Sequence, residues 1–411
     1  MEIRPILSVL MRSKTAPLLV AIQIALCLAI LANALYVVNL RQASSARPSG
    51  LADEAGTFTI TAQSVKRPTH REALAQQRRD VETLKAIPGV KAVTWISQMP
   101  MSRSGSNSSF SLDRKQARYS IILSIYYAPP GAIDVLGLKL LEGRDIAHED
   151  MVEFDAEKDL PTKTWPRAIV ITKAAADKLY PGESAVGKTL YFGTGDDAME
   201  MRVVGVVERL QTTLAEEGPN AEYSAILPVA MDLAYPRFAV GTEPGQRDRV
   251  IKDAEAALRD PANPRMVNTR TSDGDRNNRY RAERSLAWML MGVCALLLLV
   301  TASGIVGMTM LRIAQRRKQI GVRRALGARR IDIVRYFVVE NVLVSTAGIA
   351  AGLVLAVALN QLLVGALELP RLPATYLAIG AAALWALGVA AVMGPAWRAA
   401  SIPPAEATRS V

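Results

Sequence analysis

Four long apolar runs dominate this sequence. The first covers residues 16–38 and is apolar except for Pro17, Gln23 and Asn33. Three more lie in the second half of the chain, at residues 285–311, 337–367 and 376–397. A helix needs about 20 apolar residues to cross the hydrocarbon core of a bilayer. The pattern therefore predicts an α-helical membrane protein with four transmembrane helices, the first over residues 17–40.

A different pattern fills the segment between the first and second runs. Helical periodicity predicts helices at 69–87, 173–180 and 246–258. Alternating apolar positions predict strands at 57–62, 91–97, 108–113, 118–128, 167–172, 189–192, 201–207, 224–229, 237–241 and 266–269. We expect a large α+β domain over residues 41–284, made of two subdomains with mixed sheets. The acidic stretch 148–166 has little periodicity and predicts an insertion or a mobile loop.

A short basic helix is predicted between the second and third spans, over residues 315–328. Gly327 is placed to end this helix in a left-handed conformation. The helix can anchor the loop on anionic lipid, or dock on a cytoplasmic ATPase and pass motion into the membrane; the residues alone favour the anchor. Its pattern puts four apolar residues on one side, opposite the basic ones: Ile320, Leu326, Ile331 and Val334.

The positive charge sits beside the apolar runs. The chain has a net charge of +11, and residues 312–335 hold nine Arg or Lys against Asp332. The segment 41–284 is nearly neutral, with 34 basic and 33 acidic residues. This is the positive-inside pattern, which places both termini in the cytoplasm and the α+β domain outside. Nucleic-acid binding would need a basic face on a folded domain and is excluded.

The N-terminal segment and the single span-embedded acid allow two interpretations each. Residues 1–16 predict an amphipathic helix on the inner membrane face. Ala32-Asn33-Ala34 also fits a signal-peptide cleavage site, but the apolar run continues beyond it, which favours a retained span.

Glu340 is the one ionisable group within a predicted span, and we expect it to reach the headgroups rather than to serve transport. Gly348 and Gly352 have the spacing that lets helices approach closely. Residues 276–284 predict a helical stalk that prolongs the second span outward.

Cysteine and histidine usage is sparse. Cys27 and Cys294 both lie inside apolar runs, so the large domain has no disulfide framework. His70 and His148 lack a nearby ligand cluster, and we interpret them as surface residues without a metal.

One motif imitates a nucleotide site. Residues 182–189, Gly-Glu-Ser-Ala-Val-Gly-Lys-Thr, match the phosphate-binding pattern G-x-x-x-x-G-K-[ST]. A phosphate-binding loop needs a strand before it and a helix after it, so that a helix N-terminus meets the phosphates. Here the predicted order is reversed, and the loop lies outside the cytoplasm. We therefore predict no nucleotide at Lys188.

The basic stretch carries a family resemblance. The run RRKQIGVRRALGARRIDIVRYFVVEN (316–341) resembles the signature of the MacB/FtsX superfamily of ABC-transporter permeases. The large domain resembles the MacB-type periplasmic domain in two regions, IPGVKAVT with LGLKLLEGRDI, and AIVITKAAADKLYPGESAVGKTLYF with MRVVGVVERL. The tail GPAWRAASIPPAEATR resembles the closing motif of the family. The family usually has an acidic residue before its Ile-Gly, where this chain has Gln319.

The resemblance implies a coupling role for the basic helix, reversing the preference for a lipid anchor. This chain would be a non-catalytic permease that binds no cofactor or metal, with ATP and Mg²⁺ held by a separate ATPase subunit. The residues it assigns to ATPase coupling are Arg316, Arg317, Lys318, Gln319, Ile320, Gly321, Arg323, Arg324, Ala325, Leu326 and Gly327.

The implied organisation is a multi-pass protein of the bacterial inner membrane. Its segments are a cytoplasmic helix (1–16), TM1 (17–40), a periplasmic MacB-like domain (41–284), TM2 (285–311), the coupling region (312–336), TM3 (337–367), an outer loop (368–375), TM4 (376–397) and a cytoplasmic tail (398–411). Expected partners are two ATPase subunits, a second permease (identical or a sibling), membrane lipid and, for efflux, a periplasmic adaptor with an outer-membrane channel. The leading interpretation is export from the periplasmic side. An FtsX-like scaffold that regulates cell-wall hydrolases and a Lol-like lipoprotein extractor are the alternatives.

Overall fold

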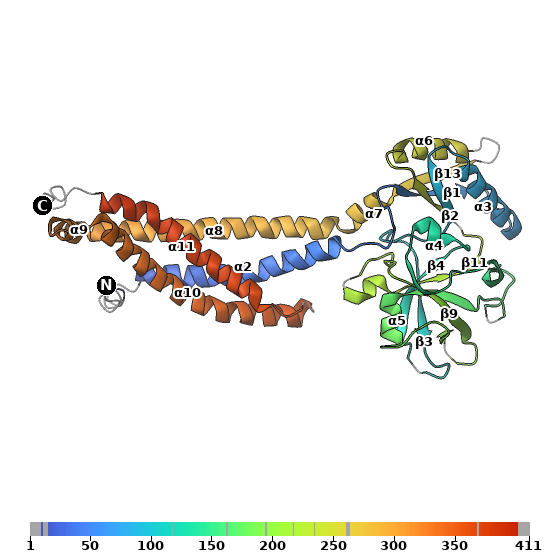
Figure 1. The fold of residues 1–411 in the computed structure, drawn as a ribbon, viewed down its shortest axis with the longest axis horizontal. Helices are drawn as coiled ribbons and strands as arrows, with labels where there is room; N and C mark the ends of the chain where they lie inside the picture. The colour runs from blue at the N-terminus through green and yellow to red at the C-terminus, as the bar shows by residue number, and fades with distance from the viewer. Residues whose placement is uncertain are drawn as a thin grey trace. The chain divides into compact units, whose positions relative to one another are not determined.

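The computed structural model describes residue 10 and residues 15–401, except 117, 162, 194, 217, 234, 260–263, 368 and 369. The predicted helix at 1–16 therefore lies almost entirely outside the described residues, as does most of the tail. The chain forms two units, a helical one from its two ends and an α+β one from residues 44–281. Figure 1 shows their elements.

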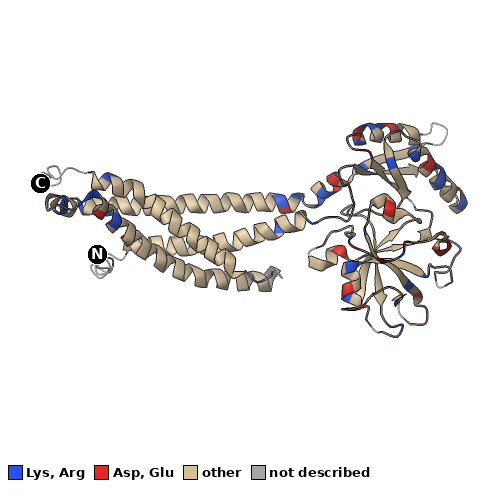
Figure 2. Ribbon diagram, in the orientation of Figure 1, with Lys and Arg blue, Asp and Glu red and all other residues tan. Residues whose placement is uncertain are grey.

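The helical unit contains the four predicted spans. They are α2 (Thr15–Ser45), α8 (Arg281–Gln315), α10 (Arg330–Leu367) and α11 (Ala374–Ala400). All four are long and apolar enough to cross a membrane, and each extends beyond its apolar run. Charged residues gather at the helix ends and leave the middles free (Figure 2).

The helices alternate in direction. Cys294 of α8 packs beside Leu31 and Ala34 of α2, so the start of α8 lies against the second half of α2. Asn39 near the end of α2 donates to the Tyr376 hydroxyl at the start of α11, 2.6 Å away. Helices α2 and α10 run parallel, with α8 and α11 antiparallel to them.

Two glycines bring α10 against α2. A Cβ atom on Gly348 would lie 2.7 Å from the Ala21 carbonyl oxygen, and one on Gly352 would lie 3.0 Å from Ala25 Cα. One turn further along, Asn33 donates to the Ala356 carbonyl at 3.1 Å. The predicted close approach at this glycine pair is confirmed, and α2 is its partner.

The α+β unit contains two large sheets and one two-stranded sheet, β11-β6. The first has four antiparallel strands in the order β13-β1-β12-β2, packed against helices α3 and α6. The strands and helices are β1 (Thr57–Ser64), β2 (Val90–Trp95), β12 (Arg237–Thr242), β13 (Arg265–Thr271), α3 (His70–Lys85) and α6 (Arg247–Leu258). Leu74 and Leu84 of α3 face this core. The strands come from the two ends of the unit, so the second sheet is built from the chain between them.

The second sheet has seven strands in the order β5-β9-β7-β10-β4-β3-β8. It is mixed, because β4–β10 and β7–β9 are parallel pairs. Its strands are β3 (Ser106–Ser111), β4 (Ile121–Tyr127), β5 (Leu140–Gly143), β7 (Ala168–Thr172), β8 (Thr189–Phe192), β9 (Met199–Val207) and β10 (Ser224–Leu227). Helices α4 (Ala132–Leu136) and α5 (Lys173–Leu179) pack on it.

The structure corrects four expectations for this unit. The four-stranded sheet is antiparallel, not mixed. The stretch 148–166 is anchored, because β6 (Val152–Glu153) pairs with β11 (Val229–Ala230) and Trp165 stacks on Phe192. The predicted stalk is broken at Tyr280, where α7 (Ser272–Arg279) ends before α8 begins. His70 is half-buried, with its Nδ1 3.1 Å from Asp232.

Candidate coupling site

The basic stretch forms the short helix α9 (Arg317–Ala325) between α8 and α10. Its end is built as predicted around Gly327, whose φ of +94° lies in the left-handed region. The Ala328 N–H donates to the Arg323 carbonyl at 3.0 Å, and the Gly327 N–H to the Arg324 carbonyl at 3.2 Å. These two bonds satisfy carbonyls at the helix end and stop the helix sharply before α10.

Tyr336 of α10 holds α9 in place. The Arg316 guanidinium lies 5.5 Å and the Arg323 guanidinium 5.6 Å from its ring centre. Arg316 also donates to the Tyr336 hydroxyl. Ile320 is buried among side chains of the helical unit. One aromatic residue and one aliphatic anchor thus fix α9 to the first half of α10.

The exposed side of α9 differs from the predicted one. Ile320 and Val334 are buried, but Leu326 is 83% exposed and Ile331 is 56% exposed. The four residues therefore do not share one side, because α9 ends at Ala325 and the chain turns at Gly327. Val322 joins the two exposed apolar residues at 50% exposure. The tip of the loop thus presents apolar side chains among basic ones.

The remaining predicted residues divide between this tip and the anchor. Gly321 is buried, and Arg316 and Arg324 are half-buried. The exposed residues are Arg317, Lys318, Gln319, Arg323, Ala325 and Gly327.

A buried ion pair beside α9 escaped the sequence analysis. Arg312 of α8 pairs with Glu340 of α10, and their side chains are only 6% and 3% exposed. Glu340 therefore does not reach the headgroups, and that expectation is wrong. Its partner Arg312 lies one residue beyond the predicted second span (285–311), so the sequence placed it in the basic loop. A signal was available in the opposite charges near the inner ends of consecutive antiparallel helices.

Residues 182–189, which match the phosphate-binding pattern, lie between a helix and a strand as predicted. Helix α5 precedes them and strand β8 follows them, so no helix begins where phosphates would bind. The Lys188 Nζ lies 2.7 Å from the Glu183 carboxylate, and this hydrogen bond holds the pKa of Glu183 below its usual value. Lys188 is thus engaged in a local surface ion pair.

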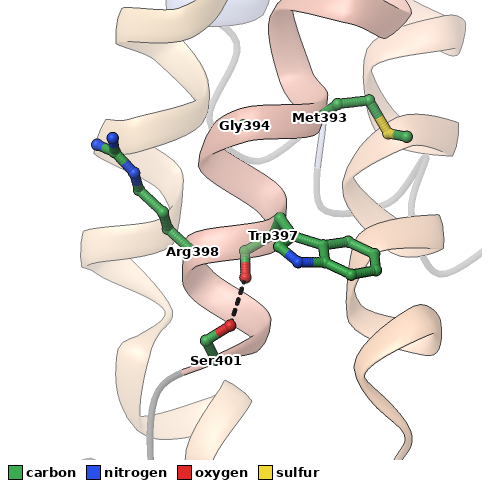
Figure 3. Close-up of a pocket in the computed structure, with 5 residues that line it drawn as sticks. All are labelled: Met393, Gly394, Trp397, Arg398 and Ser401. Atoms are coloured by element: carbon green, nitrogen blue, oxygen red, sulfur yellow. Dashed lines mark hydrogen bonds between the residues drawn. The ribbon is translucent and has the colours of Figure 1, made fainter.

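A shallow hollow of about 570 Å³ lies near the end of α11. Figure 3 shows its lining residues, with Trp397 and Met393 pointing to one side of the helix and Arg398 to the other. Ser401 Oγ donates to the Trp397 carbonyl at 3.0 Å. Among the described residues no group of three His, Cys, Asp or Glu could hold a metal ion. The hollow offers an amphipathic surface at a helix end and no reactive group.

Two family descriptions cover most of the chain. The MacB-like periplasmic core domain matches residues 20–274, and the FtsX-like permease C-terminal region matches residues 291–404. The chain is similar to a macrolide export ATP-binding/permease protein MacB of Bradyrhizobium diazoefficiens, with 30% identity over 54% of this chain and 34% of that protein. It is also similar to a pyoverdine export ATP-binding/permease protein PvdT of Pseudomonas syringae, with 33% identity over 39% of this chain and 25% of that protein.

Among solved structures, the chain is similar to the periplasmic region of MacB from Actinobacillus actinomycetemcomitans. Identity is 15%, coverage is 56% of this chain and 94% of that one, and the TM-score is 0.34. The extracellular domain of the ABC-type transporter YknZ gives 18% identity, 51% and 99% coverage, and a TM-score of 0.31.

The chain spans about a third of the length of the curated relatives it matches. Within that span it carries both parts that the family descriptions define, a MacB-like periplasmic core domain and an FtsX-like permease C-terminal region. The chain belongs to the MacB/FtsX family of ABC-transporter permeases.

Proposed function

We propose that this chain is the membrane subunit of an ABC exporter, driven by a separate ATPase that docks on α9. The observation that carries this proposal is the exposed tip of α9, where Leu326 stands 83% exposed beside basic residues. An electrostatic lipid anchor would need only the basic side chains, and the exposed leucine adds an apolar contact that such an anchor does not require. A hydrophobic side chain at a sharp helix end fits a socket on a protein partner.

The contacts around α9 suggest how motion would enter the membrane. A push on α9 would act on α10 through Tyr336, since Arg316 and Arg323 both lie against its ring. The Arg312–Glu340 pair would pass the same motion to α8, because it links the inner parts of α8 and α10. Helix α8 leads directly into the α+β unit at Arg281. The spans would then act as levers rather than as a channel, and substrate would be moved outside the membrane.

The proposed assembly follows if the ATPase supplies the energy and this chain transmits the motion. The permease would be non-catalytic, and ATP and Mg²⁺ would bind the two ATPase subunits. A second permease, identical or a sibling, would supply the other docking helix. The chain would lie in the bacterial inner membrane with both termini cytoplasmic and the α+β unit in the periplasm. An adaptor and an outer-membrane channel would carry the substrate onward.

Replacing Leu326 with Asp tests the proposal. The substitution puts a charge into the socket but leaves the neighbouring basic residues and the spans intact. We expect Leu326→Asp to insert normally and to lose co-purification of the ATPase from gently solubilised membranes. Leu160→Asp is the matched control, because Leu160 is a 59% exposed leucine of the α+β unit. Normal ATPase association of Leu326→Asp, together with normal ATP-dependent activity, would leave only the lipid-anchor interpretation.

The same purification separates the competing functions. An adaptor and an outer-membrane duct among the retained partners would support efflux. A cell-wall hydrolase would indicate signalling, and a lipoprotein carrier would indicate extraction.

A further inference from the structure

Strained backbone is concentrated in one place in the α+β unit. Among the described residues, three other than glycine have a positive φ, namely Met101 (61°), Arg103 (58°) and Ala215 (45°). They lie in two loops joined by hydrogen bonds. The Met101 N–H donates to the Thr212 carbonyl at 3.1 Å, and the Arg103 N–H to the Thr213 carbonyl at 2.9 Å. Residues other than glycine rarely adopt a positive φ, and they keep it only where the surrounding structure holds the backbone in that conformation.

The strained loops meet the chain where it leaves for α8. Tyr280, between α7 and α8, is 2% exposed and packs with Met101 and Ala215. The preceding residue, Arg279, donates to the carbonyls of Leu214 at 2.5 Å and Ala215 at 3.0 Å. Residues 211–216 and 218–222 form what we call the junction loop. It is fastened to the segment just before α8 by the two hydrogen bonds from Arg279 and by the buried Tyr280.

The same loop also holds the chain that arrives from α2. The Gln211 N–H donates to the Ser49 carbonyl at 2.8 Å, and Arg47 donates to the Gly218 carbonyl at 2.8 Å. A further hydrogen bond joins the segment that leaves α2 directly to the segment that leads to α8. Arg276 of α7 donates to the Ser45 carbonyl at 2.8 Å. The segments after α2 and before α8 are therefore bonded to one loop and to each other.

The junction loop is continuous with the centre of the seven-stranded sheet. It follows β9 and leads into β10, which are separated in the sheet only by β7. The Tyr126 hydroxyl of β4 donates to the Gln211 carbonyl at 2.5 Å. The Thr212 N–H donates to the Ala221 carbonyl at 2.8 Å, which closes the loop on itself. A displacement of the loop would thus reach three strands of that sheet without passing through a flexible linker.

We propose that the junction loop is the element through which α2 and α8 move the seven-stranded sheet, with Arg279 and Tyr280 as its positioning residues. This inference rests on the proposed function, since it needs an ATPase-driven movement of the spans. Ordinary domain anchoring is the competing explanation. Anchoring alone predicts that losing the Arg279 bonds lowers stability but leaves any transmitted movement intact.

The test follows amide exchange in the full chain reconstituted with its ATPase in lipid nanodiscs. Exchange is compared without nucleotide and after trapping with ATP and vanadate, in peptides that cover β9 and β10. We expect the unsubstituted complex to show a nucleotide-dependent change in these strands. Arg279→Gln should lose that change while ATP hydrolysis and ATPase association persist. Arg279→Lys keeps the charge but not the forked geometry, and should give an intermediate loss.

Arg281→Gln is the matched control, because Arg281 lies two residues away and donates to Asn278 within the same segment. It should keep the full nucleotide-dependent change. A full change in both Arg279 variants would overturn the inference and leave the proposed function standing. An unsubstituted complex with neither ATPase association nor a nucleotide-dependent change would overturn both.

Discussion

The two ends of α8 use arginine in opposite ways. Just before α8 begins, Arg276 and Arg279 of α7 bond to other groups of the α+β unit. Arg276 makes a forked bond to Glu54, with both N–O distances 2.6 Å, and Arg279 reaches two carbonyls of the junction loop. Beyond its other end, Lys318, Arg329 and Arg330 are exposed and make no ion pair within the described part of the chain.

This difference separates a joint within the protein from the docking surface that we propose at α9. A guanidinium that meets a carboxylate or carbonyl in forked geometry fixes the relative position of two segments. A cation left in water is available to another molecule, and its field acts before contact is made. The basic charge of the sequence thus has two roles that its position alone does not reveal.

The largest expected effect concerns the side of the membrane on which each end lies. A cysteine at exposed Ser106 of β3 should react fully with a membrane-impermeant thiol reagent in cells whose outer membrane has been permeabilised. A cysteine at exposed Ser401, after α11, should not react until the inner membrane is broken. The native thiols, Cys27 and Cys294, are buried and give little background. Labelling at Ser401 in intact inner membranes would place both regions on the same side and end the comparison.

The next effect concerns the one arginine near α9 that is buried. Glu340→Ala would leave Arg312 as an uncompensated buried charge and should cost about 3–5 kcal/mol of stability. Thermal unfolding of the solubilised protein measures this loss. The double variant Arg312→Glu with Glu340→Arg should recover a large part of it, since the pair is restored in reverse. A double variant no more stable than Glu340→Ala would show that the ion pair does not hold α8 to α10.

A smaller effect is expected at the joint, and it depends on pH. Burial raises the pKa of Glu54, but hydrogen bonds from Arg276 and Ser49 outweigh it and hold the pKa below the usual 4.5. The ionised group therefore stabilises the fold above pH 4.5, and this contribution is lost as the pH falls through the lowered pKa. Glu54→Gln should cost about 2 kcal/mol near neutral pH.

The two melting curves, those of the unsubstituted protein and Glu54→Gln, should converge in acid. Glu208→Gln removes the carboxylate of an exposed pair with Lys139 and should change stability by less than about 1 kcal/mol at any pH. A constant difference between Glu54→Gln and the unsubstituted protein at all pH values would contradict the assignment of Glu54 as an ionised partner.

The smallest expected effect comes from relieving backbone strain at Arg103, in the loop bonded to the junction loop. Arg103 is exposed and has a φ of 58°. Arg103→Gly relieves a left-handed conformation that costs about 1–2 kcal/mol and adds about 0.5–1 kcal/mol of chain entropy. We expect a slightly higher melting temperature. Arg103→Ala keeps the unfavourable conformation and should show no gain, so equal behaviour of the two variants would mean that no strain resides there.

The sequence predicted what depends on local pattern. Apolar runs located the spans, alternation located most strands, and Gly327 marked the end of α9. The orientation of Leu326 was missed because α9 has only nine residues, too few for its own periodicity to define a face. Its rotation is set by where α8 stops and by the contact of Arg316 with Tyr336.

The remaining misses involve contacts between residues distant in the chain. The opposite charges of Arg312 and Glu340 made their pairing possible but did not single it out, and nothing near Met101 indicates a neighbour at Ala215. Such contacts arise when separate elements pack, so a single sequence without pairing information does not reveal them. The antiparallel four-stranded sheet belongs to the same class, because its strands come from both ends of the unit.

That arrangement governs the order in which the protein can be made. Strand β1 pairs with β13, placing Phe58 opposite Thr271, so the first strand to emerge from the ribosome must wait for the last. The seven-stranded sheet needs only residues 106–227 and can form while the chain is still being exported. Until β12 and β13 arrive, β1 carries apolar side chains and an unpaired backbone edge, which are the features that favour misassembly. The interval before the second span is inserted is therefore the one in which the α+β unit is most open to misassembly.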